Sequence, residues 1–217
     1  MKKFFVSLLF CIPLVLTLSA CNKSTDYFSY VSEYRKSVYF YEDDVYTVKI
    51  YSVDKETPNA LDGYVGNVAN ITEVFFECEK SVSEAEVDLL GQGGEMSYLA
   101  VTRNFYLSFS GTELEGASIP VTVKIDGEEK KFEVFNVAEE GTIDGKQALK
   151  CVEEYDGESF KNLTEGGNFS GEISIRLLYD EGCFYYVGIC NREKQVHAYL
   201  VDGVDGRIIA GRETEAE

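Results

Sequence analysis

The fold class is decided by residues 45–51, which read VYTVKIY. Tyr46, Val48 and Ile50 fall on one face of an extended chain, and the polar residues between them fall on the other. Alternation of this kind is typical of a β-strand that buries one face and leaves the other in solvent. We therefore expect a protein built mainly from β-sheet.

Runs of the same kind recur through the middle of the chain, separated by turn-forming segments such as Asp126-Gly127 and Gly91–Gly94. Seven or so short strands without helical periodicity predict an immunoglobulin-like β-sandwich over residues 37–138, with a small barrel as the alternative. The 15 tyrosines and 14 phenylalanines, with only three prolines, also favour strands. The further strand runs are Ile71–Cys78, Ser97–Val101, Phe105–Phe109, Ile119–Ile125 and Lys131–Val137.

The pair Asp126-Gly127 is predicted to close a β-hairpin, because Asp-Gly suits the two-residue turns whose twist matches that of the strands. Pro120 is expected at a strand entrance or on an edge, since it cannot donate a ladder hydrogen bond. Alternate residues on the two arms should point into the core, and these are Val121, Val123, Ile125, Phe132 and Val134, with Asn136 at the next inward position.

Residues 139–217 are predicted to form a small α+β domain. Between Asp144 and Tyr155 the apolar residues recur at the spacing of one helix face; Asp144 can cap the start of that helix and Gly157 can end it. The helix must lay its apolar face on the sheet that follows, because neither surface is stable in water. The strand runs of that sheet are Gly171–Tyr179, Cys183–Cys190, Val196–Val201 and Arg207–Ala210.

The N-terminus combines two lysines, an apolar run that ends at residue 18, and the sequence Leu18-Ser19-Ala20-Cys21. The apolar run of roughly 15 residues is short for a stable membrane span, which takes about 20. The pattern resembles the signal peptide and lipobox of bacterial lipoproteins. An ordinary secretory peptide with a chance cysteine is the alternative.

The lipobox resemblance implies where the protein is located. Residues 1–20 would be a signal peptide that is removed, and the thiol of Cys21 would carry a diacylglycerol. Residues 21–36 would then tether the fold to the bacterial plasma membrane on its extracytoplasmic side, in the cell envelope.

Charge limits the possible partners. Without residues 1–20 the chain has 18 basic and 38 acidic side chains, a formal net charge of −20. Such a surface repels phosphate backbones, so we expect no nucleic-acid binding. It also repels anionic lipid, so contact with the membrane is expected through the two acyl chains on Cys21.

Four cysteines remain once the signal peptide and Cys21 are set aside, and they lie in a compartment where disulfides persist. Cys151 is on the predicted helix, and Cys183 and Cys190 are at the two ends of one predicted strand. A single disulfide between Cys151 and either Cys183 or Cys190 is a possible link within this domain, with buried free thiols as the alternative. Cys78 is the fourth.

No constellation in the sequence indicates a catalyst. His197 is the only histidine, and its place in a strand run favours a structural role over that of a base or ligand. Asp202–Gly206 is interpreted as a β-turn, because it lacks the alternating oxygen ligands and distal Glu of a calcium loop. No serine lies in a Gly-x-Ser-x-Gly motif, and 38 acidic residues are too many to single out a catalytic pair. We therefore predict no catalytic, metal-binding or cofactor-binding residues, and no enzyme.

Two segments of the last third are similar to PepSY-type domains. Residues 142–149, TIDGKQAL, resemble that family's helix entrance, and the succession of strand, Asp202, turn, Gly206 and final strand resembles its ending. The likeness covers about 70 residues and departs from the family at Ile208 and Ile209, where an acidic or polar residue is common. It implies an extracytoplasmic binding or peptidase-inhibiting module at residues 139–217.

These inferences together predict a non-catalytic envelope lipoprotein that binds a peptide, a protease or a cell-wall partner. Exposed strand edges and tyrosines suit binding by strand addition. Two other hypotheses stay open: an envelope hydrolase that uses two carboxylates, and a structural or assembly lipoprotein of a surface complex.

Overall fold

The computed structural model describes residues 25–58 and 63–215. The predicted signal peptide, the lipobox and Cys21 lie outside the described residues, so their roles stay predictions. None of the described helices is long and apolar enough to cross a membrane.

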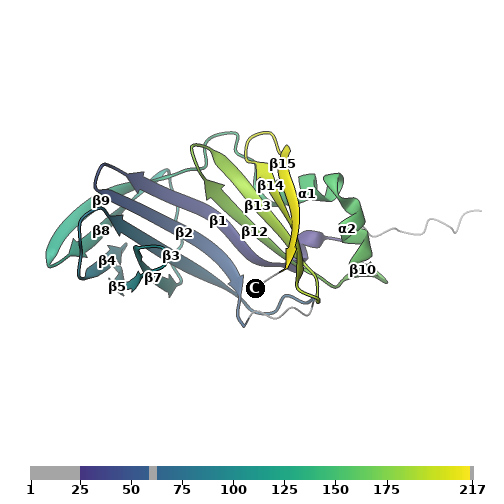
Figure 1. Ribbon diagram of the computed structural model, residues 1–217, viewed down its shortest axis with the longest axis horizontal. Helices are drawn as coiled ribbons and strands as arrows, with labels where there is room; N and C mark the ends of the chain where they lie inside the picture. Colours follow the sequence, from purple (N-terminus) through teal and green to yellow (C-terminus); the bar gives the residue numbers. More distant parts are fainter. Residues whose placement is uncertain (1–24, 59–62, 216–217) are drawn as a thin grey trace, which may run out of the picture.

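The described part of the chain is mainly β, as expected (Figure 1). Thirteen strands form one continuous sheet, and two short strands form a separate hairpin. The elements are η1 (Tyr27–Tyr30), β1 (Val31–Glu42), β2 (Tyr46–Glu56), β3 (Val68–Cys78), β4 (Ala85–Leu89), β5 (Gln92–Glu95), β6 (Ser97–Leu99), β7 (Asn104–Ser110), β8 (Ser118–Ile125), β9 (Glu128–Asn136), α1 (Gly145–Tyr155), α2 (Gly157–Asn162), β10 (Thr164–Glu165), β11 (Asn168–Phe169), β12 (Glu172–Tyr179), β13 (Cys183–Cys190), β14 (Gln195–Asp202) and β15 (Ile208–Glu215).

Strand β1 joins the two halves of the sheet. One of its edges pairs with β2 along almost its whole length. Its other edge pairs in parallel with β12 from Val31 to Arg35, and in antiparallel fashion with β9 at Tyr39 and Phe40. The sheet therefore branches at β1, and Figure 1 shows β12 diverging from β9 at this strand.

Nine strands form a nearly closed, antiparallel, barrel-like sheet in the order β5-β4-β8-β9-β1-β2-β3-β7-β6. Its ends approach each other where β5 contacts β7. The sheet encloses a core of aliphatic and aromatic side chains, of which the largest fully buried members are Tyr39, Phe76, Ile50, Leu89, Val48 and Val74.

This arrangement corrects the predicted immunoglobulin-like sandwich. A sandwich needs two separate sheets, whereas the strands between residues 31 and 136 all belong to one hydrogen-bonded sheet. Alternation in the sequence predicts which face of a strand is buried. It does not reveal whether that face meets a second sheet or the far wall of the same rolled sheet.

The local predictions for β2, β8 and β9 are confirmed, whereas two others are corrected: Gln92 to Gly94, expected in a turn, lie in β5, and the strand expected over Ser97–Val101 ends at Leu99. Val48 and Ile50 are buried on one face of β2, and β8 and β9 pair across the turn at Asp126-Gly127. Pro120 lies near the start of β8, one residue before the β4 pairing begins at Val121. The predicted inward residues Val121, Val123, Ile125, Phe132 and Val134 are buried.

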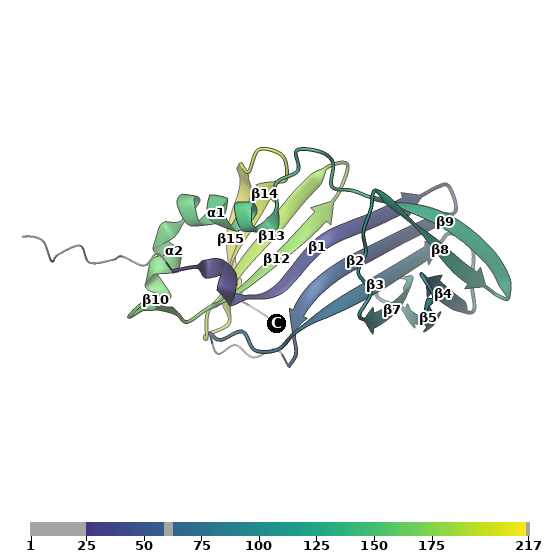
Figure 2. The same cartoon turned by 180° about the vertical axis from the view of Figure 1, so that it is seen from behind.

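Strands β12 to β15 extend the sheet beyond β1, and α1 packs on β12, β13 and β14 as predicted for an α+β unit (Figure 2). Asp144 and Gln147 form a capping box, in which Asp144 Oδ1 accepts from Gln147 N at 2.7 Å. Gly157 does not simply end the helix. The C-cap of α1 is Asp156, which is also the N-cap of α2, and Gly157 is the first residue of α2.

Residues 27–36 were expected to belong to a tether, and the structure corrects this. They form η1 and the first half of β1, and Tyr27, Phe28 and Tyr34 pack against the core beneath α1. The strand was missed because register shifts near Ser32 and Lys36 interrupt its alternation.

The glycines of β5 give a test of the barrel. A Cβ on Gly93 would lie 1.9 Å from the carbonyl oxygen of Val87, whereas a Cβ on Gly94 would meet nothing within 4 Å. Both glycines have positive φ, at +153° and +147°. Since the backbone strain is similar, the difference between Gly93→Ala and Gly94→Ala isolates the steric clash.

We expect Gly93→Ala to lower the free energy of unfolding by at least about 2 kcal/mol more than Gly94→Ala, because the clash requires β4 and β5 to separate. Urea denaturation of both variants measures this. Equal losses would show that β5 does not lie against β4 in this way.

Candidate functional site

The last strand of the sheet has an open edge. β15 pairs with β14 on one side, and none of the described strands pairs with its other side. The strand is eight residues long, and Ile209 to Glu213 are exposed. It therefore presents a row of backbone N–H and C=O groups that are free for another chain.

The two faces of β15 differ in chemistry. Opposite residues of an antiparallel pair share a face, so Gly211 lies on the same face as Tyr199, and Glu213 on the same face as His197. This is the face that α1 covers, because Tyr199 belongs to the core beneath the helix. Arg212 lies on the opposite face.

A carboxylate ties the helices to β14. Asp156, between α1 and α2, accepts hydrogen bonds from the Ser159 hydroxyl at 2.7 Å and from the hydroxyl of Tyr199. The ring of Tyr155 meets that of Tyr199 edge to face, with centroids 6.2 Å apart. Tyr199 is only 6% exposed, whereas Tyr155 is 65% exposed. An exposed aromatic ring therefore lies beside a fixed one, close to the open edge.

The pKa values of this pair follow from their surroundings. Partial burial raises the pKa of Asp156, but the hydrogen bonds from Ser159 and Tyr199 outweigh it and hold that pKa below the usual value. Burial, together with the neighbouring carboxylate, raises the pKa of Tyr199 to about 12. Asp156 is thus ionised and Tyr199 is a neutral donor throughout the physiological range.

His197 lies in β14 between Ile189 of β13 and Glu213 of β15, and it also interacts electrostatically with Asp156. The only nucleophilic side chain in this cluster, Ser159, donates to Asp156. The arrangement is that of a helix cap and not of a nucleophile and its base.

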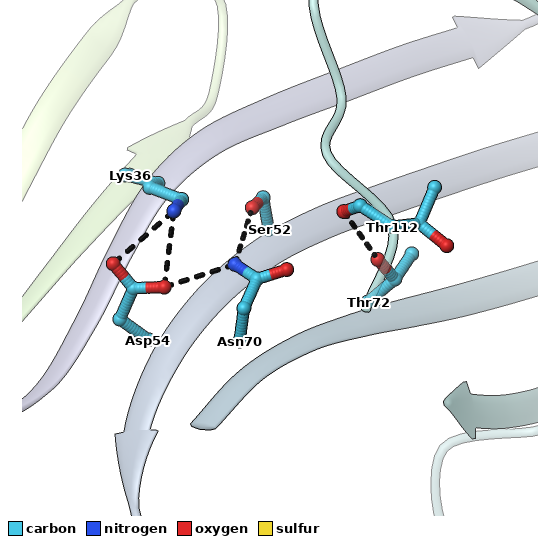
Figure 3. Close-up of polar contacts among 6 residues, drawn as sticks. All are labelled: Lys36, Ser52, Asp54, Asn70, Thr72 and Thr112. Atoms are coloured by element: carbon cyan, nitrogen blue, oxygen red, sulfur yellow. Dashed lines mark hydrogen bonds and ion pairs between the residues drawn. The ribbon is translucent and has the colours of Figure 1, made fainter. Parts of the chain in front are cut away.

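A second polar cluster connects β1, β2 and β3 (Figure 3). Lys36 Nζ donates to both carboxylate oxygens of Asp54, at 3.0 and 3.1 Å. Asn70 Nδ2 donates to Asp54 at 2.9 Å and to the Ser52 hydroxyl at 3.4 Å. Beside them, the hydroxyl of Thr72 donates to the backbone oxygen of Thr112 at 3.4 Å.

This cluster joins the bulge of β1 to β2 and β3, and the loop after β7 crosses over it. Because a carboxylate can only accept, Asp54 fixes the orientation of the Asn70 amide. The Asn70 Oδ1 atom is then buried without a hydrogen-bond partner among the described residues. We interpret the cluster as a structural link, because its side chains donate their hydrogen bonds to the neighbouring strand β2 and to the loop after β7.

The cysteines chosen from the sequence are partly buried free thiols in this structure. Cys151 Sγ lies 2.7 Å from the position that a Cβ on Gly206 would take, and Gly203 N donates to the backbone oxygen of Cys183. Both cysteines therefore border the turn between β14 and β15, and both pack on the core beneath α1.

Cys190 is at the other end of β13, where it pairs with Glu172 and Val196. Cys190 therefore lies away from the turn that Cys151 borders. The disulfide stays a prediction, and of its two predicted pairings only that of Cys151 with Cys183 agrees with the strand register. Burial raises the pKa of both Cys183 and Cys190, which disfavours their reactive thiolates.

The turn predicted at Asp202–Gly206 is present. Asp202 Oδ1 accepts from the backbone N–H groups of Val204 and Asp205, at 2.9 and 3.3 Å, so this oxygen serves the turn. Within residues 25–58 and 63–215 no group of three or more His, Cys, Asp or Glu side chains is arranged to hold a metal ion.

The sequence interpretation missed the Asp156 cluster. Its signal was Asp156-Gly157-Glu158-Ser159, an N-cap followed by a short helix, which was taken as the end of the preceding helix. The contact with Tyr199, 43 residues away, has no local signal.

The bond between Tyr199 and Asp156 gives a testable prediction. Tyr199→Phe removes one donor from a charged acceptor, and we expect it to lower the free energy of unfolding by about 1.5–3 kcal/mol at pH 7. Tyr155→Phe, on the neighbouring exposed ring, should change it little.

The effect should depend on pH. The pKa of Asp156 is lower in the folded state than in the unfolded state. Its carboxylate therefore stabilises the folded protein above the pKa of the unfolded state, and this stabilisation is lost as the pH falls through the pKa of the folded state. We expect the difference between Tyr199→Phe and the wild type to shrink below about pH 4. Urea titrations at pH 7 and at pH 2 measure it; a difference that stays constant would contradict this account.

No protein-family model matches this chain, and no curated protein or solved structure is similar enough to it to indicate a relative.

Proposed function

We propose that this protein is a non-catalytic, extracytoplasmic lipoprotein that binds a segment of a protease, peptide or other envelope partner by strand addition to β15. The observation that carries the proposal is the open edge of that strand. An added strand forms backbone hydrogen bonds with every second residue of the edge, which gives affinity without a deep pocket.

The strands at the two ends of the barrel-like sheet are weaker candidates. β6 has three residues and β5 has four, whereas β15 has eight. A longer edge offers more ladder bonds to an incoming strand. β15 is also held in place by β14, whose Tyr199 is bonded to the helix junction at Asp156. A fixed edge loses less conformational freedom when it binds.

The resemblance to PepSY-type domains supports the same function. The residues that carry it lie at the start of α1 and in β13 to β15, and α1 packs on this sheet. Such domains imply an extracytoplasmic binding or peptidase-inhibiting role. No residue cluster in the described part of the chain favours the hydrolase or the assembly hypothesis over this one.

Lipidation is tested at Cys21. Cys21→Ala removes the thiol that accepts the diacylglycerol, so the protein should no longer incorporate labelled lipid, and its precursor should keep residues 1–20. Metabolic labelling and intact-mass analysis of the bacterial membrane fraction measure this, with Cys78→Ala as the matched control. Equal labelling of Cys21→Ala and the control would rule out the lipobox.

Strand addition is tested with proline. Successive N–H groups of a strand point to opposite edges, so one of Gly211 and Arg212 donates towards β14 and the other towards the open edge. Proline at the outward position should leave the melting temperature nearly unchanged and abolish capture of partners in an envelope crosslinking experiment. Proline at the inward position should lower the melting temperature.

The wild type and the two single variants, Gly211→Pro and Arg212→Pro, are compared in parallel. If the variant with the wild-type melting temperature still captures every partner that the wild type captures, β15 is not the binding edge.

A further inference from the structure

We infer that the β15 edge selects a partner strand that carries a basic and an aromatic side chain two residues apart. This inference rests on the proposed strand addition. It concerns the face of β15 that lies on the side of α1, and it follows from three features of that face.

The first feature is the glycine at the centre of the edge. Gly211 leaves an empty position on the α1 side of β15, directly opposite Tyr199. A Cβ there would lie 3.4 Å from the ring of Tyr199, so the aromatic surface extends up to the glycine. A side chain from an added strand, about 4.8 Å further out, can lean across this position without a clash.

The second feature is the exposed ring of Tyr155. It stands edge to face on Tyr199 and is 65% exposed, so it is available to a side chain that lies over Gly211. Aromatic pairs with such geometry are stabilising beyond the area they bury. Tyrosine also loses little conformational freedom on contact. We therefore assign an aromatic residue to the partner position opposite Gly211.

The third feature is the charge beside the glycine. Glu213 is exposed on the same face, two residues along β15, and Asp156 lies on this side of the sheet as well. Opposite charges on directly opposed strand residues attract, and like charges repel. The whole chain carries 38 acidic and 20 basic side chains, so its long-range field also favours a basic partner.

Together these features define a short pattern. Because side chains on one face of a strand are two residues apart, an antiparallel partner would read Lys or Arg, any residue, then Phe or Tyr. The basic residue then faces Glu213, and the aromatic residue lies over Gly211. Arg212, on the other face, does not contribute to this choice.

The test uses the full-length mature protein in detergent and three heptapeptides with blocked ends. The first is Thr-Val-Lys-Val-Tyr-Val-Thr, the second has Glu in place of Lys, and the third has Ala in place of Tyr. Fluorescence anisotropy with a labelled N-terminus measures the dissociation constants. The matched variants are Glu213→Lys and Arg212→Glu. Each reverses the sign of one side chain, the first on the α1 side of β15 and the second on the opposite face.

We expect the lysine peptide to bind about fivefold more tightly than the glutamate peptide, and also more tightly than the alanine peptide. Glu213→Lys should reverse the preference between lysine and glutamate, whereas Arg212→Glu should preserve it. Binding of all three peptides with equal affinity, or a preference that Glu213→Lys leaves unchanged, would overturn the inference and leave strand addition intact.

Two further outcomes would each contradict the inference for a different reason. If no peptide binds at the highest soluble concentration, strand addition itself fails, and this inference fails with it. If the wild type is a dimer in sedimentation experiments and becomes a monomer when the outward position of the edge is proline, the occupant is a second copy of this chain, and the assigned partner is wrong.

Discussion

The pairing of β1 with three neighbours is the constraint on which the rest of the structure depends. Its first half completes the sheet beneath α1, and its second half closes the barrel wall through β9. Two register shifts, near Ser32 and Lys36, let one strand pair with both diverging branches of the sheet. The ion pair of Lys36 with Asp54 holds the second of these irregular positions. The two hydrophobic cores therefore share a common wall and are not independent units joined by a linker.

A rigid edge is a consequence of this framework. β15 is the outermost strand, yet its neighbour β14 carries Tyr199 and Val201 in the core beneath α1. The bond from Tyr199 to Asp156 connects that strand to both helices. The backbone groups of the edge are thus held in a fixed line, although no described strand covers them. For the proposed binding function, a pre-formed edge matters more than a cavity, because affinity arises from a row of backbone bonds.

Much of the fold could be predicted from the sequence because alternation is a local signal. The alternation of Tyr46, Val48 and Ile50 predicted β2, and the helical spacing of the apolar residues from Ala148 to Tyr155 predicted α1. The first half of β1 was not predictable, since its bulges break the alternation, and neither was the rolling of the strands into a barrel, which depends on contacts between distant residues. The open edge was foreseen only in general terms. The bond of Tyr199 with Asp156 arises from tertiary packing, which a single sequence does not encode in any local pattern.

The branching at β1 also bears on the order in which the chain can fold. Ser32 and Ile173 are in contact although 141 residues separate them, whereas β8 and β9 are joined by a two-residue turn. We expect contacts of such high sequence separation to form late, because closing a long loop costs conformational entropy before the new contacts can offset that cost. A chain that emerges from its N-terminus first would hold the outer edge of β1 unpaired until β12 arrives. The barrel would then form first, and the strands beneath the helix would be added to it in chain order, with β15 last and paired only with β14 among the described strands.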